Sequence, residues 1–187
     1  MRGSRLTDEA LIDRDEIGID GSFLLRLKAI EDSRGSFSEL YRDEWLAGAS
    51  EMVQSNVSRS RAGVLRGLHF HREQADYWVV VGGDAVVGLV DLRDGSPTQR
   101  VAVKLDLSEQ DPAGLYIPPG VAHGFYARTD LMLNYFVDRY FSGEDEFGVA
   151  WNDPEIGIAW PSDSPILSER DRSNPSLAEV LAVASPE

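Results

Sequence analysis

The feature that most restricts the fold of this chain is a series of short apolar segments, alternating or β-branched, along its middle. Clusters of Gly, Pro, Asp and Ser separate these segments, as expected for strands joined by tight turns. Strand-like segments occupy residues 23–30, 52–60, 63–70, 76–83, 84–93, 98–107, 114–119 and 131–141. Helix is expected only at residues 42–49 and in the C-terminal tail. The pattern predicts an all-β sandwich or barrel.

The length fits one domain. A chain of 187 residues can bury a sizeable core but is too short for two ordinary domains. We expect an N-terminal arm over residues 1–20 and a single β domain over residues 21–187, with a short C-terminal helical appendage. The first residues lack the apolar segment of a signal peptide, and no apolar run approaches the roughly 20 residues that span a bilayer.

Composition excludes several classes of function. The formal net charge of −14 argues against a nucleic-acid partner or an anionic membrane, because either would demand a basic face. The chain has no cysteine, so disulfides and thiol catalysis are excluded and a cytoplasmic location is expected.

The chain has three histidines, and two of them stand close together in the segment 63–70 and just beyond it. Residues i and i+2 of a strand point to the same face, so His69 and His71 should project together while Leu68 and Phe70 face the other way. His123 follows a Pro–Gly turn. All three histidines are therefore predicted to converge inside one barrel.

The spacing of these residues resembles the two motifs of the cupins. Gly63-x5-His69-x-His71-x4-Asp76-x6-Gly83 resembles the first motif, and Pro118-x-Gly120-x2-His123 resembles the core of the second. The resemblance implies a double-sheet jelly-roll barrel. It also implies a metal site as an alternative, with the imidazoles and the carboxylate as ligands. These ligands would be His69, His71, Asp76 and His123. The alternative is that the shared spacing reflects only barrel turns and strand lengths.

A longer resemblance runs from about residue 24 to residue 175. Six segments, in order along the chain, resemble those of the dTDP-4-dehydrorhamnose 3,5-epimerase family, whose cupin barrel works without a metal: "EDSRGSFSE", "QSNVSRSRAGVLRGLHF", "VDLRDGSPT", "YIPPGVAHGF", "WNDPEIGIAWP" and "LSERD". The resemblance implies an isomerase of deoxysugar biosynthesis that acts on a dTDP-sugar, requires no cofactor and forms a homodimer.

The family resemblance also implies roles for individual residues. Epimerisation beside a ketone needs a base, stabilisation of the enolate, and an acid on the opposite face. His69 matches the base, Asp171 the carboxylate that orients it, and Tyr135 the opposite acid. The remaining matches are substrate-binding positions: Arg34, Glu39, Gln54, Asn56, Arg66, His123 and Tyr140. Among them, Arg66 would bind the diphosphate, His123 would lie near the enolate or the base, and Tyr140 would be a stacking surface for the nucleobase.

The sequence departs from the family at His71 and Asp76. The family usually has a residue that cannot bind metal in place of His71, and a lysine in place of Asp76. A carboxylate there would repel an enolate unless it is protonated or bound to a metal. The favoured function is an epimerase that inverts C3, C5 or both in a dTDP-4-keto-6-deoxyhexose. A metal-dependent cupin acting on a related sugar or small metabolite is the alternative, and a non-catalytic sugar-nucleotide-binding relative is a third.

Overall fold

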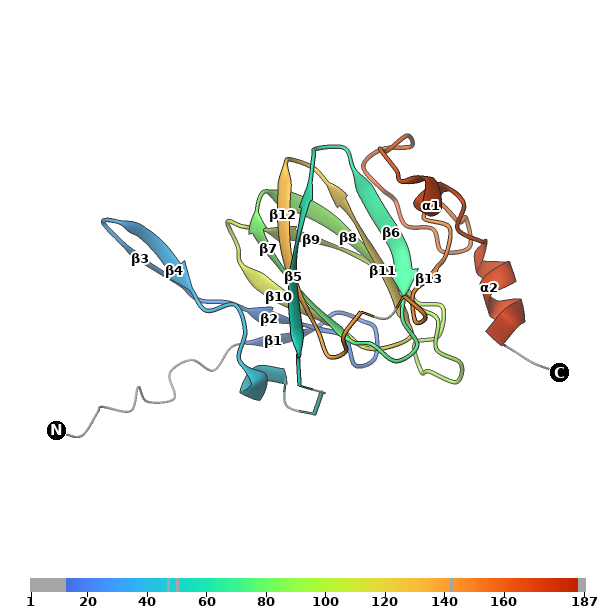
Figure 1. Ribbon diagram of the computed structural model, residues 1–187, viewed down its shortest axis with the longest axis horizontal. Helices are drawn as coiled ribbons and strands as arrows, with labels where there is room; N and C mark the ends of the chain where they lie inside the picture. The colour runs from blue at the N-terminus through green and yellow to red at the C-terminus, as the bar shows by residue number, and fades with distance from the viewer. Residues whose placement is uncertain (1–12, 47, 50, 142, 185–187) are drawn as a thin grey trace.

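Two antiparallel sheets packed face to face form the body of the protein (Figure 1). The computed structural model describes residues 13–46, 48–49, 51–141 and 143–184. One sheet has six strands, in the spatial order β1 (Arg14–Glu16), β2 (Phe23–Arg26), β10 (Ala113–Ile117), β7 (Asp76–Gly82), β12 (Leu131–Val137) and β5 (Gln54–Ser60). The other has five, in the order β13 (Phe147–Gly148), β6 (Leu65–Phe70), β11 (Val121–Ala127), β8 (Asp84–Asp91) and β9 (Ala102–Ser108). The predicted all-β double-sheet class is confirmed.

Two further parts of the chain lie outside these sheets. A separate hairpin, β3 (Ala29–Asp32) and β4 (Gly35–Ser38), projects from the sandwich (Figure 1). Helical structure consists of the 3₁₀ helix η1 (Asp43–Leu46) and the short helices α1 (Glu169–Arg172) and α2 (Leu177–Ala184). The two α-helices lie beside the five-stranded sheet, as the predicted C-terminal appendage.

The structure corrects three details of the predicted strand pattern. The segment 23–30 is two strands, because the chain leaves the six-stranded sheet after Arg26 and turns into the hairpin. Residues 121–127, read only as a motif after a turn, form β11. Part of the predicted N-terminal arm is strand β1, which pairs with β2, and residues 1–12 of that arm lie outside the described residues.

Both sheets are covered on both faces by apolar side chains. The largest cluster lies between the sheets and includes Leu89 and Leu115. A second cluster covers the outer face of the six-stranded sheet, beneath Trp45 and its neighbours. The third covers the outer face of the five-stranded sheet, where Leu68 and Phe70 pack with residues of the C-terminal segment. The prediction that Leu68 and Phe70 face away from the barrel interior is confirmed.

A β-bulge in β6 changes which residues of this strand face the interior. Arg66 pairs with Phe125 of β11 and His69 pairs with His123, so three steps along β6 match two steps along β11. Strict alternation would send Arg66 and His69 to opposite faces. The extra residue reverses that relation, since a bulge re-aims the side chains beyond it. Both residues consequently line the interior.

Two glycines make the bulge possible. Gly67 has φ +128°, a conformation that residues with a side chain rarely adopt. A methyl group on Gly67 would lie 2.6 Å from the Cα of Gly124 on the neighbouring strand. A methyl group on Gly124 would lie 2.7 Å from the carbonyl oxygen of Arg66. The two backbones can therefore approach this closely only because neither residue has a side chain.

The bulge gives a first prediction. Gly67→Ala should lower the free energy of unfolding by about 2–5 kcal/mol, because it combines backbone strain with overpacking against a strand. Gly35→Ala is the matched control: its φ is +130°, but a methyl group there would meet nothing within 4 Å. In the control, only the backbone strain should lower the free energy of unfolding, by about 1–3 kcal/mol. Urea unfolding of both variants measures the difference, and equal losses would contradict the proposed close approach.

Candidate active site

A cavity of about 470 Å³ opens between the two sheets. Its walls are built by side chains from strands of both sheets and from the loop that follows β12. The lining residues are Gln54, Asn56, Ser58, Arg66, His69, His71, Gln74, Asp76, Trp78, His123, Phe125, Leu133, Tyr135, Val137, Phe141 and Glu146. The three histidines thus converge in one cavity, as the strand pattern predicted.

His69 is held by a carboxylate from the far end of the chain. Its Nε2 lies 2.6 Å from Oδ1 of Asp171. Ser168 is the N-cap of α1, and its hydroxyl accepts a hydrogen bond from the Asp171 N–H at 3.0 Å and donates to Asp171 Oδ2 at 2.8 Å. The short helix therefore fixes the carboxylate, and the carboxylate fixes the imidazole.

The electrostatics of this pair suit a base. Burial by itself would raise the pKa of Asp171, but the hydrogen bonds from His69 and Ser168 outweigh it and hold the pKa below its ordinary value. Asp171 is therefore ionised at neutral pH. With Nε2–H donated to Asp171, the lone pair of the neutral His69 ring resides on Nδ1.

Tyr135 lines the cavity from the opposite wall. His69 belongs to β6 in the five-stranded sheet, whereas Tyr135 belongs to β12 in the six-stranded sheet. Burial raises the pKa of Tyr135, and the nearby carboxylates of Asp76 and Glu146 raise it further. The phenol is consequently protonated at neutral pH and can donate a proton.

Polar side chains at the side of the cavity are arranged by local hydrogen bonds. Arg66 donates from Nε to the hydroxyl of Ser60 at 3.0 Å. Gln54 donates to Oδ1 of Asn56 at 2.9 Å, both being residues of β5. Among the described lining residues, Arg66 is the one Lys or Arg side chain. An anionic group entering the cavity would meet its guanidinium there.

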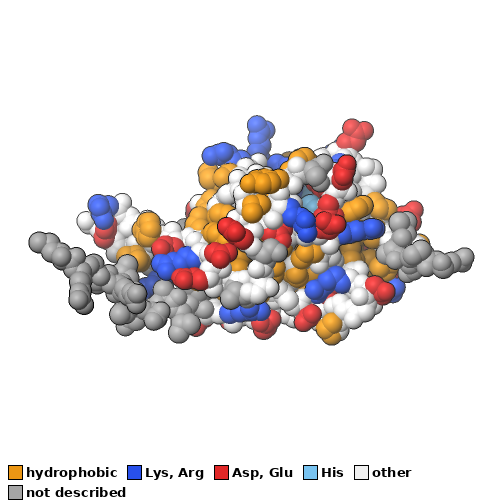
Figure 2. Space-filling model, turned by 60° about the horizontal axis from the view of Figure 1, so that its bottom comes forward, with side chains coloured by type: hydrophobic (Ala, Val, Ile, Leu, Met, Phe, Trp, Pro, Cys, Tyr) orange, Lys and Arg blue, Asp and Glu red, His pale blue; other side chains and the backbone are white. Residues whose placement is uncertain are grey.

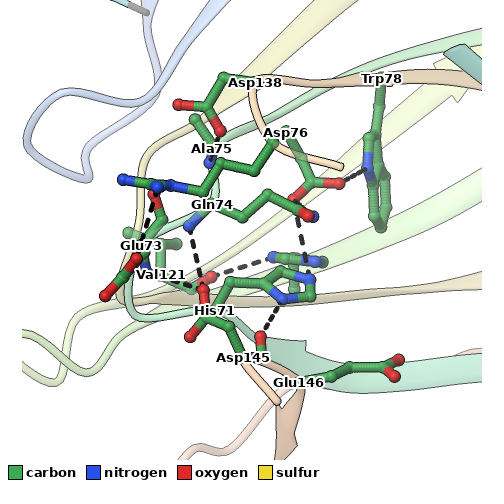
Figure 3. A network of polar contacts seen from close by, with 12 residues as sticks. His71, Glu73, Gln74, Ala75, Asp76, Trp78, Val121, Asp138, Asp145 and Glu146 are labelled. Carbon is green, nitrogen blue, oxygen red and sulfur yellow. Dashed lines mark hydrogen bonds and ion pairs between the residues drawn. The ribbon is translucent and has the colours of Figure 1, made fainter. Parts of the chain in front are cut away.

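A second cluster at the cavity consists of His71, Asp76 and His123 (Figure 3). The ligand-type atoms of these three side chains lie within 4.8 Å of one another. His71 Nε2 is 3.9 Å from Asp76 Oδ2. His123 is buried, and this lowers its pKa to about 4 although the charge of Asp76 opposes the shift. The imidazole of His123 is therefore neutral at neutral pH.

The structure changes the set of metal ligands that the sequence suggested. His69 does not belong to this cluster of three, and its Nε2 is engaged by Asp171. The four-ligand set that included His69 is not present in the described residues, and the possible set is reduced to His71, Asp76 and His123. The site residues proposed for proton transfer and those able to bind a metal are consequently different residues.

Three predicted binding residues do not line this cavity. Arg34 and Glu39 lie on and just after the projecting hairpin, where Arg34 pairs with Asp32 and Glu39 pairs with Arg42. Tyr140 is 74% exposed and borders an adjacent cavity of about 440 Å³. Within one chain, therefore, the hairpin residues are separated from the histidines, and Tyr140 stands outside the main cavity.

Several residues of the site carried no clear signal in the sequence. Asp145 accepts hydrogen bonds from the backbone N–H groups of Arg72, Glu73 and Gln74, and its carbonyl bonds His71 (Figure 3). Trp78 contacts His123 edge to face, with ring centroids 5.1 Å apart. Glu146 and Phe141 also line the cavity. The adjacent aromatic pair at 140–141 was the one detectable sign, since exposed aromatic residues often mark binding surfaces.

The surface shows no concentration of one charge on the face seen in Figure 2. Acidic and basic side chains are interspersed there, and histidine atoms are visible in a hollow among them. Within the described part of the chain, no helix combines the length and the apolar character needed to cross a bilayer.

The His69–Asp171 pair gives a second prediction. Because the folded-state pKa of Asp171 lies below the unfolded value, ionised Asp171 stabilises the fold above about pH 4, and this contribution is lost as the pH falls through the lower folded value. Asp171→Asn should lower the free energy of unfolding by about 1–3 kcal/mol at pH 7. The difference from the wild type should become smaller below pH 4. Asp163→Asn, at an exposed position, is the control. Urea unfolding at several pH values tests this, and a deficit independent of pH would contradict it.

Comparison with known proteins identifies the family. The family profile of dTDP-4-dehydrorhamnose 3,5-epimerase matches residues 16–179. The dTDP-4-dehydrorhamnose 3,5-epimerase of Streptomyces griseus is 40% identical over 176 residues, which cover 88% of this chain and 86% of that protein. Among solved structures, an RmlC epimerase of Mycobacterium tuberculosis superposes with a TM-score of 0.88 at 33% identity, covering 92% of each chain.

A solved structure with a bound sugar nucleotide is also similar. ChmJ, a 3'-monoepimerase from Streptomyces bikiniensis in complex with dTDP-quinovose, has a TM-score of 0.86 and 31% identity over 91% of this chain and 90% of its own. The resemblance noted in the sequence is therefore confirmed over most of the chain. The protein belongs to the dTDP-4-dehydrorhamnose 3,5-epimerase family.

Proposed function

We propose that this protein is an isomerase that inverts one or both of the carbons beside the ketone of a dTDP-4-keto-6-deoxyhexose, and that His69, Asp171 and Tyr135 move the protons. The observation that carries the proposal is the placement of a carboxylate-held imidazole and a protonated phenol on opposite walls of one cavity. Inversion requires a proton to leave one face of a carbon and another to arrive on the opposite face.

The proposed reaction proceeds in two proton transfers. Nδ1 of His69 removes the proton from the carbon beside the ketone. The electron pair of that C–H bond becomes the C=C bond of the enolate, and the π electrons of the ketone move onto its oxygen. Asp171 stabilises the imidazolium that results. Tyr135 then donates a proton to the opposite face of the carbon as the carbonyl re-forms. The side chains supply both the base and the acid, so the two proton transfers themselves need no cofactor.

The remaining lining residues support a sugar nucleotide as the substrate. The guanidinium of Arg66 can pair with a diphosphate, since its planar fork matches phosphate oxygens. The exposed rings of Tyr140 and Phe141 flank the adjacent cavity, which gives a nucleobase an aromatic surface. The structural relative with bound dTDP-quinovose supports a dTDP-sugar as the substrate.

We also place the enzyme in the cytoplasm, in line with a sequence that has no cysteine.

We propose that the enzyme works as a homodimer. The hairpin β3–β4 exposes Ile30 (58%) and Phe37 (64%) and projects away from its own sandwich (Figure 1). Such an extended apolar arm is suited to pack against a second copy. The matched binding residues Arg34 and Glu39, which do not line the cavity of their own chain, would then reach the cavity of the other subunit.

The base gives the third prediction. With a dTDP-4-keto-6-deoxyhexose in D₂O, the protein should introduce deuterium at one or both of the carbons beside the ketone. His69→Ala should slow this exchange at least about 10²-fold, because positioned proton transfer contributes that much. Asp171→Asn should slow it at least about 10-fold, because the imidazolium loses its charge partner. Exchange is followed by NMR, and exchange in His69→Ala as fast as in the wild type would disprove the role of the base.

Tyr135→Phe separates the acid from the base, and this is the fourth prediction. The variant keeps His69 and the shape of the cavity but has no proton to deliver to the opposite face. Deuterium exchange should therefore continue within about 10-fold of the wild-type rate, while formation of the inverted sugar falls at least about 10²-fold. Comparing the NMR exchange rate with the yield of epimer measures both. Equal losses of exchange and inversion would show that Tyr135 is not the opposite acid.

The homodimer gives the fifth prediction. Arg34→Ala and His69→Ala should each be weakly active when pure. If the hairpin of one subunit completes the cavity of the other, a mixed dimer combines an intact His69 with an intact Arg34 in one of its two sites. Mixing the two variants under subunit exchange should therefore restore activity well above that of either alone. Activity that stays at the level of the separate variants, while native mass spectrometry detects mixed dimers, would rule out the shared site.

A further inference from the structure

The carboxylate of Asp76 occupies an environment that its neighbours satisfy poorly. Asp76 is 3% exposed. Its described hydrogen bonds are long, at 3.3 Å from the Gln74 amide and 3.4 Å from the Trp78 indole (Figure 3). The imidazole Nε2 of His71 lies 3.9 Å from Asp76 Oδ2, too far for a hydrogen bond. Buried carboxylates are normally paired closely or bound to a metal, and hydrogen bonds of this length are weak.

Two histidines present nitrogen atoms toward this carboxylate. The Nδ1 of His71 bonds the carbonyl oxygen of Asp145, and the Nδ1 of His123 bonds the carbonyl oxygen of Val121 at 3.0 Å. A carbonyl oxygen can only accept, so each Nδ1 carries the proton. Each Nε2 then has a free lone pair. Backbone carbonyls fix the tautomer of metal-binding histidines in the same way.

We propose that His71, Asp76 and His123 bind one divalent first-row transition-metal ion at the floor of the cavity. Two imidazoles and one carboxylate suit Zn²⁺, Fe²⁺ or Co²⁺ better than Mg²⁺ or Ca²⁺, which prefer all-oxygen sites. The three ligand atoms are within 4.8 Å of one another. Ligand atoms around 2.1 Å from one ion lie roughly 3.0–3.4 Å from each other. The three ligand atoms must therefore move closer together by about 1 Å for an ion to bind. The loosely held Asp76 can make that shift by rotating its side chain.

The metal would supply positive charge where the proposed reaction needs it. His123 pairs with His69 across β6 and β11, so the cluster adjoins the base. Three protein ligands leave coordination positions open toward the cavity. The described lining carries two carboxylates, Asp76 and Glu146, and one guanidinium. A bound cation offsets Asp76 and stabilises the developing enolate oxygen, while His69 and Tyr135 still move the protons. This role rests on the proposed function, but metal binding does not.

Titration with Co²⁺ tests the site without reference to activity. The apo wild-type protein, prepared with EDTA and dialysed, should bind one Co²⁺ per chain with a visible absorption spectrum of nitrogen and oxygen ligation. Zn²⁺ should displace it, whereas Mg²⁺ should not. His71→Gln and Asp76→Asn should each weaken Co²⁺ binding at least about 10²-fold, since each removes a ligand.

His69→Gln is the matched control for binding. It removes a histidine from the same cavity, but His69 is engaged by Asp171, so Co²⁺ binding should be unchanged. Circular dichroism and thermal unfolding verify that each variant is folded, and Zn²⁺ should raise the Tm of the wild type and of His69→Gln but not of Asp76→Asn. Binding well below one ion per chain, binding that survives loss of His71 or Asp76, or binding that is lost with His69 would overturn the site.

The exchange assay tests the role separately. In D₂O, apo wild-type protein should retain exchange that depends on His69, and Zn²⁺ or Co²⁺ should accelerate it at least about 10-fold. Stoichiometric binding without acceleration would overturn the catalytic role of the metal. Failure of exchange in both the apo and the metal-loaded protein, with Co²⁺ still bound by His71, Asp76 and His123, would overturn the proposed epimerase function and leave the metal site intact.

Discussion

The active-site arrangement depends on the one extra residue in β6. Without the bulge at Gly67, Arg66 and His69 would face opposite sides of the five-stranded sheet, and the guanidinium and the imidazole could not share a cavity. The bulge in turn requires Gly124 opposite, because a side chain on either glycine would collide with the other strand. A backbone contact between two glycines therefore determines which side chains of β6 line the cavity.

The two-sheet architecture separates the chemistry into two walls. The five-stranded sheet contributes His69, and the six-stranded sheet contributes Tyr135, so the proposed base and the proposed acid face each other across the cavity. The carboxylate comes from a third place, the helix α1 in the C-terminal segment. That segment also buries the outer face of the five-stranded sheet through residues such as Leu177. Packing outside the sandwich thus holds Asp171 in position for a residue inside it.

Much of this could be predicted from the sequence, and the exceptions have physical reasons. Alternation located most strands, and the spacing of the histidines correctly placed all three in one interior. The pairing of His69 with Asp171 came from the family resemblance, because no local pattern connects residues so far apart in the chain. The bulge was missed because alternation assumes an unbroken register. The part played by Asp145 was missed because it acts through backbone groups of a loop. Arg34 could not be placed, because it lies on a hairpin that projects away from the sandwich and pairs there with Asp32 instead of lining the cavity.

The three histidines show how one side-chain type acquires different roles within one cavity. What distinguishes them is the group bonded to the other ring nitrogen. The carboxylate of Asp171 accepts a hydrogen bond from Nε2 of His69, so the lone pair of the neutral ring lies on Nδ1. Backbone carbonyl oxygens accept hydrogen bonds from Nδ1 of His71 and of His123. The lone pair of each ring therefore lies on Nε2, where it can bind a metal ion. The hydrogen-bond partners that the folded chain supplies thus distinguish the proposed base, His69, from the two proposed metal ligands, His71 and His123.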